Sequence, residues 1–74
     1  MPLINVKLLE GVFSPAQKKE VAQKLTETLV SIKGEAIRSA TLVVVEEVKS
    51  GDWTVGGQSL TTEAVHAMVG RKAA

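Results

Sequence analysis

The sequence has no cysteine and few aromatic residues, with one phenylalanine, one tryptophan and no tyrosine among its 74 residues. Without cysteine, a disulfide framework and a thiolate metal site are both excluded. The single histidine, His66, excludes most zinc arrangements and the ordinary Ser-His and Cys-His catalytic pairs. A small domain without such staples usually gains stability by forming an oligomer. We therefore predict one domain, residues 1–74, that assembles with copies of itself and holds no metal.

Long apolar segments and blocks of one charge are also missing. No apolar run approaches the length that spans a bilayer, and the N-terminus lacks the basic and apolar regions of a secretory signal. The formal net charge is +1, and lysines and glutamates alternate instead of forming a basic stripe for nucleic acid. Together with the absence of cysteine, these features predict a cytoplasmic protein that binds neither membranes nor nucleic acid.

A strand–helix–strand unit is the strongest pattern that is present. Residues 3–9 alternate as a β-strand does, and residues 40–48 predict a second strand that is apolar on both faces. Between them, Ser14, Pro15 and Gln17 predict a capped helix start, and Gly34 is placed to end the helix. Between these ends, apolar residues at helical spacing form one stripe along the helix, made up of Val21, Ala22, Leu25, Leu29 and Ile32. Strands joined by such a crossover should be parallel.

The C-terminal third predicts two smaller elements. Gly56-Gly57 indicates a tight turn and so a small hairpin between residues 53–55 and 58–60. Thr61 and Thr62 can cap a short last helix with an apolar side at Ala64, Val65, Met68 and Val69. The fold class is therefore α+β. Because one helix covers only one face of the sheet, another subunit should seal the other face, which includes Leu3 and Leu9.

Pro2 stands directly after the initiator methionine. Removal of Met1 would turn its nitrogen into a secondary amine, which titrates, whereas the nitrogen of an internal proline does not. An N-terminal α-amine has a pKa of about 7.7 to 8.0, and burial among apolar groups lowers it into the range of a good general base. Taken alone, a proline at this position more often merely begins a strand.

The surroundings of Pro2 strengthen the catalytic interpretation. The chain carries in order a Met-Pro-Leu-Ile start, Leu8-Leu9-Glu10-Gly11, a capped amphipathic helix, Glu46-Glu47-Val48-Lys49 after a valine-rich strand, and Gly51-Asp52-Trp53-Thr54-Val55-Gly56-Gly57. This arrangement closely resembles the 4-oxalocrotonate tautomerase family over residues 2–60. The resemblance implies a β-α-β tautomerase-like subunit of a homo-oligomer. A hexamer is expected, with a trimer or a dimer as alternatives.

The resemblance also implies roles for three residues. Pro2 matches the catalytic proline, which moves a proton between enol oxygen and carbon without a cofactor. Trp53 matches an aromatic that lines the apolar pocket, and Leu9 matches a residue whose backbone N–H meets the substrate. The family's two arginines have no match, because Val12-Phe13 and Leu42 stand in their places. Their loss removes the bidentate clamp on a dicarboxylate.

Other charged residues are weaker candidates. The candidates for a cation that replaces the family's arginines are Lys33, Arg38, Lys49 and Arg71. Arg38 is the best placed of them, although most of these residues are more typical of a solvated surface. Glu10 is placed to activate water but reads better as an exposed loop carboxylate. His66 reads as a surface residue of the last helix.

Three functions remain open from the sequence. The first is an isomerase that interconverts the enol and keto forms of a small monocarboxylate carbonyl compound, with Pro2 as base and acid. The second is a catalytically silent assembly or small-ligand-binding subunit, which the absent arginines would suit. The third is hydration or dehalogenation of an unsaturated acid, which the same absences weaken.

Overall fold

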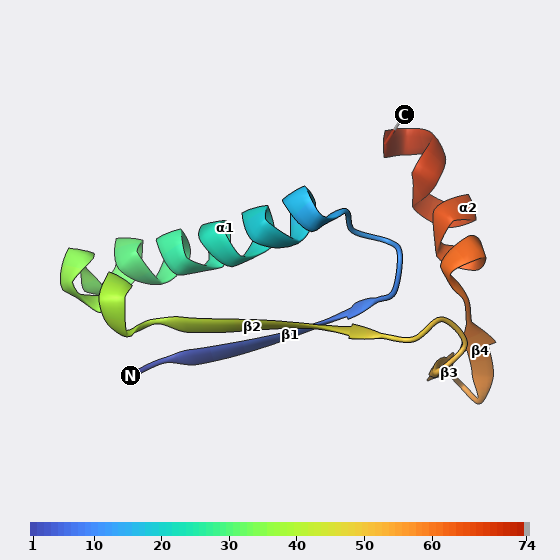
Figure 1. Cartoon of the computed structure of the whole chain (residues 1–74), viewed down its shortest axis with the longest axis horizontal. Coiled ribbons are helices and arrows are strands. Elements are labelled where there is room, and N and C mark those ends of the chain that lie inside the picture. Colours follow the sequence, from blue (N-terminus) through green and yellow to red (C-terminus); the bar gives the residue numbers. More distant parts are fainter. Residues whose placement is uncertain (74) are drawn as a thin grey trace.

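A computed structural model of the chain describes the backbone of residues 1–73 and the side chains of residues 1–69. Its elements follow the predicted order (Figure 1). They are β1 (Leu3–Leu9), α1 (Pro15–Lys33), the 3-10 helix η1 (Glu35–Ala40), β2 (Leu42–Val48), β3 (Trp53–Val55), β4 (Gln58–Leu60) and α2 (Thr62–Ala73). The predicted β-α-β unit, C-terminal hairpin and last helix are all confirmed.

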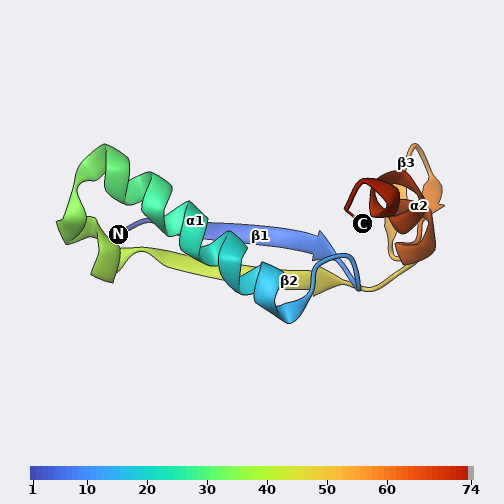
Figure 2. The same ribbon diagram turned by 90° about the horizontal axis from the view of Figure 1, so that it is seen from above.

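Strands β1 and β2 pair in parallel with the register Leu3↔Leu42 through Leu9↔Val48. Helix α1 lies diagonally across one face of this two-stranded sheet (Figure 2). The half-buried side chains of both strands alternate with exposed ones, as expected where one face meets a helix. A partly buried ion pair between Lys18 and Glu47, at 3.2 Å, also ties α1 to β2.

Helix α1 begins and ends where the sequence predicts. The Ser14 hydroxyl accepts from the Gln17 N–H at 3.1 Å, and the Gln17 side chain accepts from the Ser14 N–H at 2.9 Å. Gly34 closes the helix with a φ of 103° and donates its N–H to the Val30 carbonyl at 2.7 Å. Local capping chemistry therefore sets both ends.

The predicted stripe of α1 is wrong at Ile32, which is 70% exposed. Nineteen helical residues extend about 28 Å, whereas seven strand residues extend about 23 Å. The last turn of α1 therefore overhangs the sheet and leaves Ile32 without a strand beneath it. Val30, which was not predicted, is half-buried instead.

The second strand begins at Leu42, two residues later than predicted, because η1 precedes it. Thr41 ends η1 by donating its hydroxyl to the Ile37 carbonyl at 2.8 Å and its N–H to the Arg38 carbonyl at 3.3 Å. A 3-10 turn of this length has no apolar period of its own, so the sequence pattern did not show it.

The predicted hairpin and last helix form by local rules. Gly56 and Gly57 both have positive φ, at 59° and 83°, as a two-residue type I′ turn requires. Strands β3 and β4 pair antiparallel around them. The Thr61 hydroxyl then accepts from the Ala64 N–H at 3.1 Å and caps α2.

Within the described part of the chain, one face of the β1–β2 sheet has no covering element along the length that α1 occupies on the other (Figure 1). Leu3, Leu42 and Val44 are 62%, 53% and 41% exposed there. Leu9 does not belong to this exposed patch, contrary to the prediction, because it is only 7% exposed. It lies at the end of β1 that is nearer to the hairpin and α2 (Figure 1).

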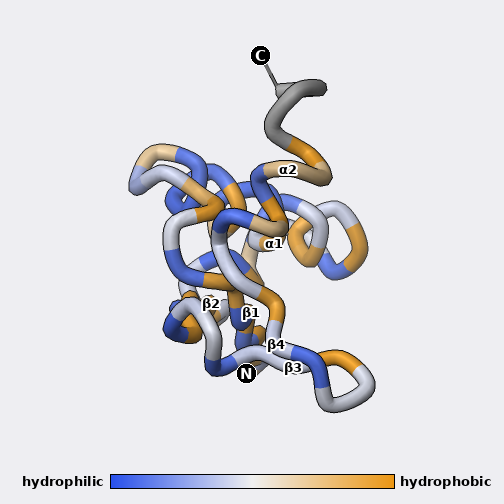
Figure 3. Tube along the Cα trace, turned by 90° about the vertical axis from the view of Figure 1, so that its right-hand side faces the viewer, coloured by the Kyte–Doolittle hydropathy of each residue, from blue (hydrophilic) through white to orange (hydrophobic). Residues whose placement is uncertain are grey.

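The single chain has very little core. Among the described side chains, Leu9 alone is buried. Figure 3, viewed from the hairpin end, shows α1 on one side of the two strands and apolar residues mixed with polar ones along the coloured part of the trace. The radius of gyration is 14.9 Å, whereas about 11 Å is expected for a compact domain of this length. No helix among the described residues is long and apolar enough to cross a membrane.

Candidate functional site

Pro2 lies at the start of the sheet. It is half-buried, and its carbonyl accepts the Leu42 N–H at 3.0 Å, which is the first bond of the β1–β2 ladder. Met1 before it is 89% exposed. While Met1 is attached, the Pro2 nitrogen is an amide and cannot act as a base. The ladder therefore fixes the position of Pro2, and the Met1 attached to its nitrogen is exposed.

Leu9 and Trp53 lie at the opposite end of the molecule. Leu9 ends β1, seven residues and about 23 Å from Pro2 along an extended strand. Trp53 opens β3, is half-buried, and pairs with Leu60. Figure 1 shows the hairpin at the end of the sheet away from the N-terminus. One chain therefore does not bring Pro2 together with Leu9 and Trp53.

The backbone of Leu9 faces the open edge of the sheet. The Leu42 N–H bonds to the Pro2 carbonyl and the Glu10 N–H bonds to the Val48 carbonyl at 2.7 Å, so the even-numbered residues of β1 direct their backbone groups toward β2. The odd-numbered residues direct theirs the other way. The Leu9 N–H is thus directed away from β2, toward the edge of the sheet that carries no further strand among the described residues.

The turn after β1 is held by remote residues. The Leu9 carbonyl accepts the Val12 N–H at 3.3 Å, with Gly11 at a φ of 81°. The Glu10 carboxylate accepts the Ser50 N–H at 3.0 Å. The Thr62 hydroxyl donates to the Glu10 carbonyl, and His66 Nε2 lies 3.0 Å from the Gly11 carbonyl oxygen.

These contacts change the interpretation of two residues. Glu10 and His66 are exposed, as predicted, but each also fastens the turn that follows Leu9. The partners are 40 to 55 positions apart along the chain. Sequence periodicity reports only on neighbouring residues, so it carried no signal for this arrangement.

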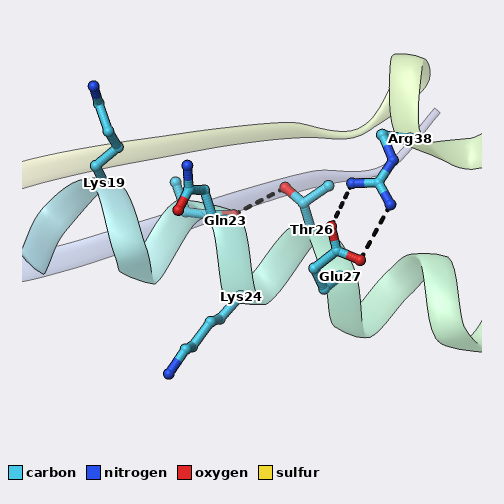
Figure 4. Close-up of a pocket in the computed structure, with 7 residues that line it drawn as sticks. Lys19, Gln23, Lys24, Thr26, Glu27 and Arg38 are labelled. Carbon is cyan, nitrogen blue, oxygen red and sulfur yellow. Dashed lines mark hydrogen bonds and ion pairs between the residues drawn. The ribbon is translucent and has the colours of Figure 1, made fainter.

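Arg38, the best placed candidate for a replacement cation, is already paired. Its guanidinium donates to the carboxylate of Glu27 (Figure 4) and to that of Glu35. Hydrogen bonds from Arg38 lower the pKa of both carboxyl groups, and they raise the pKa of Arg38 itself. Within one chain this cation is therefore engaged by two anions. Lys33 and Lys49 form no ion pair among the described side chains, and the Arg71 side chain lies outside them.

A shallow groove of about 570 Å³ runs along the side of α1 (Figure 4). It contains none of the three predicted site residues. Three of its four charged residues are already paired, Lys24 with Glu20 at 2.8 Å and Arg38 with Glu27. The described residues also hold no group of three or more His, Asp or Glu side chains able to bind a metal ion. The lining residues of the groove are Lys19, Ala22, Gln23, Lys24, Thr26, Glu27 and Arg38.

Comparison with known proteins gives a consistent result. The family model described as tautomerase enzyme matches residues 2–63 and so begins at Pro2. A probable tautomerase of Campylobacter jejuni is 39% identical over 67 residues, which cover 90% of this chain and 94% of the relative. A probable tautomerase of Dickeya dadantii is 31% identical over 61 residues, which cover 82% and 90% of the two chains.

Solved structures show the same fold. The crystal structure of a 4-oxalocrotonate tautomerase homologue has a TM-score of 0.67 and 35% identity, covering 77% of this chain and 87% of its own. The crystal structure of DmpI from Helicobacter pylori has a TM-score of 0.68 and 25% identity, covering 90% and 96%. With a family match over most of its length and relatives above 30% identity, this chain belongs to the tautomerase family.

Proposed function

We propose that this chain is the subunit of an oligomeric tautomerase that interconverts the enol and keto forms of a small monocarboxylate carbonyl compound. Pro2 is the general base and acid, and it acts after Met1 has been removed. The observation that carries the proposal is the position of Pro2. It is the first residue of the family match, it is fixed by the first ladder bond of the sheet, and the methionine attached to it is exposed.

The chemistry requires one titrating amine. The free Pro2 nitrogen accepts the proton of the enol hydroxyl as the carbonyl forms, and it returns a proton to the carbon that was part of the enol double bond. No redox step and no cofactor enter this exchange. A base with a pKa near neutrality serves both halves of the reaction, and burial among apolar side chains shifts an α-amine in that direction.

The site needs at least two copies of the chain. Pro2 at one end of β1 meets Leu9 and Trp53 at the other end only if the second pair comes from another subunit. The chain exposes 5402 Å², whereas about 4,400 Å² is expected for a compact monomer of its mass. The excess of roughly 1,000 Å² is similar to the area that one partner buries in a stable interface, about 800 Å². A hexamer is our first choice, with a trimer or a dimer as the alternatives.

The available cations favour one carboxylate over two. Arg38 is engaged by Glu27 and Glu35, so it does not supply a free guanidinium. Lys33, beside the Pro2 end, and Lys49, beside the Leu9 end, form no ion pair among the described residues. Neither lysine clamps a carboxylate bidentately as an arginine does, so a dicarboxylate would be held poorly in an apolar site, where an uncompensated ion costs several kcal/mol.

The substrate comparison tests the proposal. Processed protein should turn over the monocarboxylate phenylenolpyruvate with a higher kcat/KM than the dicarboxylate 2-hydroxymuconate. An efficient dicarboxylate reaction would contradict the substrate class and would show that another cation has taken over the role of the missing arginines.

A silent assembly or ligand-binding subunit is the second candidate. The observation that favours it is the double engagement of Arg38, which leaves the described part of the chain without an unpaired guanidinium. The intact mass of the protein from its native cells separates the two, because a chain that keeps Met1 has no basic proline. Hydration or dehalogenation of an unsaturated acid is weaker still, since a carboxylate must be polarised there too.

A further inference from the structure

Helix α2 lies almost entirely beyond the family match, which ends at residue 63. In Figure 1 it rises away from the sheet, and only its first turns lie near the rest of the chain. Met68 is 68% exposed and Val69 is 43% exposed, so its later residues add little to the core. Packing on the described chain therefore does not account for the presence of this helix.

The polar contacts of α2 converge on one turn. Thr62 and His66 are four residues apart, so their side chains leave the same face of the helix. The Thr62 hydroxyl binds the Glu10 carbonyl, and His66 Nε2 binds the next carbonyl, that of Gly11, at 3.0 Å. Because a carbonyl only accepts, Nε2 must carry the proton in this contact. We call Thr62, His66 and the two carbonyls the α2 clasp.

The clasp is part of a closed network. The Thr62 N–H donates to the Ser50 hydroxyl at 3.0 Å, and the Ser50 N–H donates to the Glu10 carboxylate at 3.0 Å. The turn after Leu9 is thereby bonded to the end of β2 and to the start of α2 at once. Rotation of the Glu10–Gly11 peptide would break the bond from Thr62, and rotation of the Gly11–Val12 peptide would break the bond from His66.

We infer that Thr62 and His66 are positioning residues, which hold the turn after β1 so that the Leu9 N–H stays aimed at the substrate at the open sheet edge. The inference rests on the proposed function, because Leu9 meets the substrate only there. It makes α2, most of which lies beyond the family match, a working part of the site. Neither side chain touches the substrate, and both act through the backbone that follows Leu9.

Kinetic constants of the processed protein on one monocarboxylate enol test the inference. Thr62→Val keeps the shape of the side chain and removes the O–H, while His66→Ala removes the ring. Each should raise KM about 5-fold with kcat within twofold of wild type, because the Leu9 N–H contributes equally to binding of substrate and transition state. His66→Gln retains an N–H donor and should restore most of the KM. Glu63→Gln, an exposed neighbour on α2, is the control and should change nothing.

Hydrogen exchange supplies a readout without substrate. The Val12 N–H, which closes the turn onto the Leu9 carbonyl, should exchange faster in Thr62→Val and His66→Ala and at the wild-type rate in Glu63→Gln. If wild type is active and KM stays within twofold of wild type in both variants, the positioning role is overturned and the proposed function stands. A processed wild type that turns over no enol overturns both. If Thr62→Val does not fold, the variants His66→Ala and His66→Gln, which change an exposed residue, still test the inference.

Discussion

At the scale of single residues, Gly11 carries two constraints that can be separated. Its φ of +81° lies in the left-handed region, and a Cβ added there would come within 3.0 Å of the Thr62 methyl. Gly57 has nearly the same φ, +83°, but nothing lies within 4 Å of its added Cβ. The two glycines therefore share the backbone strain and differ in the steric contact.

We expect Gly57→Ala to lower the free energy of unfolding by about 1–2 kcal/mol, the usual cost of a left-handed L-residue. Gly11→Ala should lower it further, because the Thr62 side chain must also move. Urea denaturation of both variants measures the difference. Thr62→Ser in the Gly11→Ala background removes the obstructing methyl and should recover the additional loss. Equal losses in the free energy of unfolding of the two glycine variants would show that the Thr62 side chain moves aside without destabilising the fold.

A further prediction about a single residue concerns whether Pro2 performs the chemistry. Processed protein should be active on an enol and the Met1-retaining form nearly inactive, because an acylated proline has no basic lone pair. In processed protein kcat/KM should rise with pH as the amine loses its proton, with an apparent pKa below the roughly 7.7 of an unperturbed α-amine. Pro2→Ala is a milder test, since it leaves a primary amine. Equal rates from the processed and Met1-retaining forms would exclude Pro2 from the mechanism.

At the scale of elements, the sequence predicts the helix ends and turns that neighbouring side chains set. It does not predict how far a helix extends past the strands that it covers. The capping box of α1, the Gly34 end and the Gly56-Gly57 turn follow from side chains a few residues apart, and all three are present. Ile32 was misplaced because helical periodicity does not show where the underlying strand stops. The clasp was missed because its partners are brought together only by the complete fold. Roles for Pro2, Leu9 and Trp53 came from the family resemblance and stay predictions.

The ion pairs of Arg38, which connect η1 to α1 through Glu27, should stabilise the fold in a pH-dependent way. Arg38 holds the pKa of Glu27 and Glu35 below the usual 4.5, so the folded state binds fewer protons there than the unfolded state. The stabilisation is therefore present above the unfolded pKa and is lost as pH falls through the folded values. Between pH 6 and pH 3 the urea midpoint should fall more in wild type than in Arg38→Ala.

Lys19→Ala is the matched control for this effect. Lys19 lines the same groove but forms no ion pair among the described residues. Its variant should keep the wild-type loss of stability in acid. If Arg38→Ala loses as much stability in acid as wild type does, the arginine contributes nothing to the link between α1 and η1.

At the scale of the whole molecule, the chain is extended and incompletely covered. It measures 42 × 28 × 19 Å, and the face of the sheet opposite α1 exposes Leu3, Leu42 and Val44. Lys7 and Glu46 pair across this face at 2.6 Å, which places one polar contact within an otherwise apolar surface. A surface of this composition suits contact with a second copy.

We expect sedimentation to show an oligomer at micromolar concentration. Val44→Lys places a charge at the centre of the uncovered face and should shift the population toward smaller, less stable species. Thr28→Lys adds the same charge to an exposed position of α1 and should leave the assembly intact. A stable folded monomer of the wild-type chain would end the assembly proposal, and the composite site with it.

The first hydrogen bond of the β1–β2 ladder does not depend on whether Met1 is present. Leu42 donates to the carbonyl of Pro2, proline has no N–H to lose, and Met1 makes no hydrogen bond within the described chain. Excision of Met1 therefore removes no bond from the sheet. Under the proposed chemistry, the chain that keeps Met1 is an inactive precursor, and removal of that residue frees the Pro2 amine. It can fold and assemble first, and a single cut then decides how many subunits of each oligomer are active.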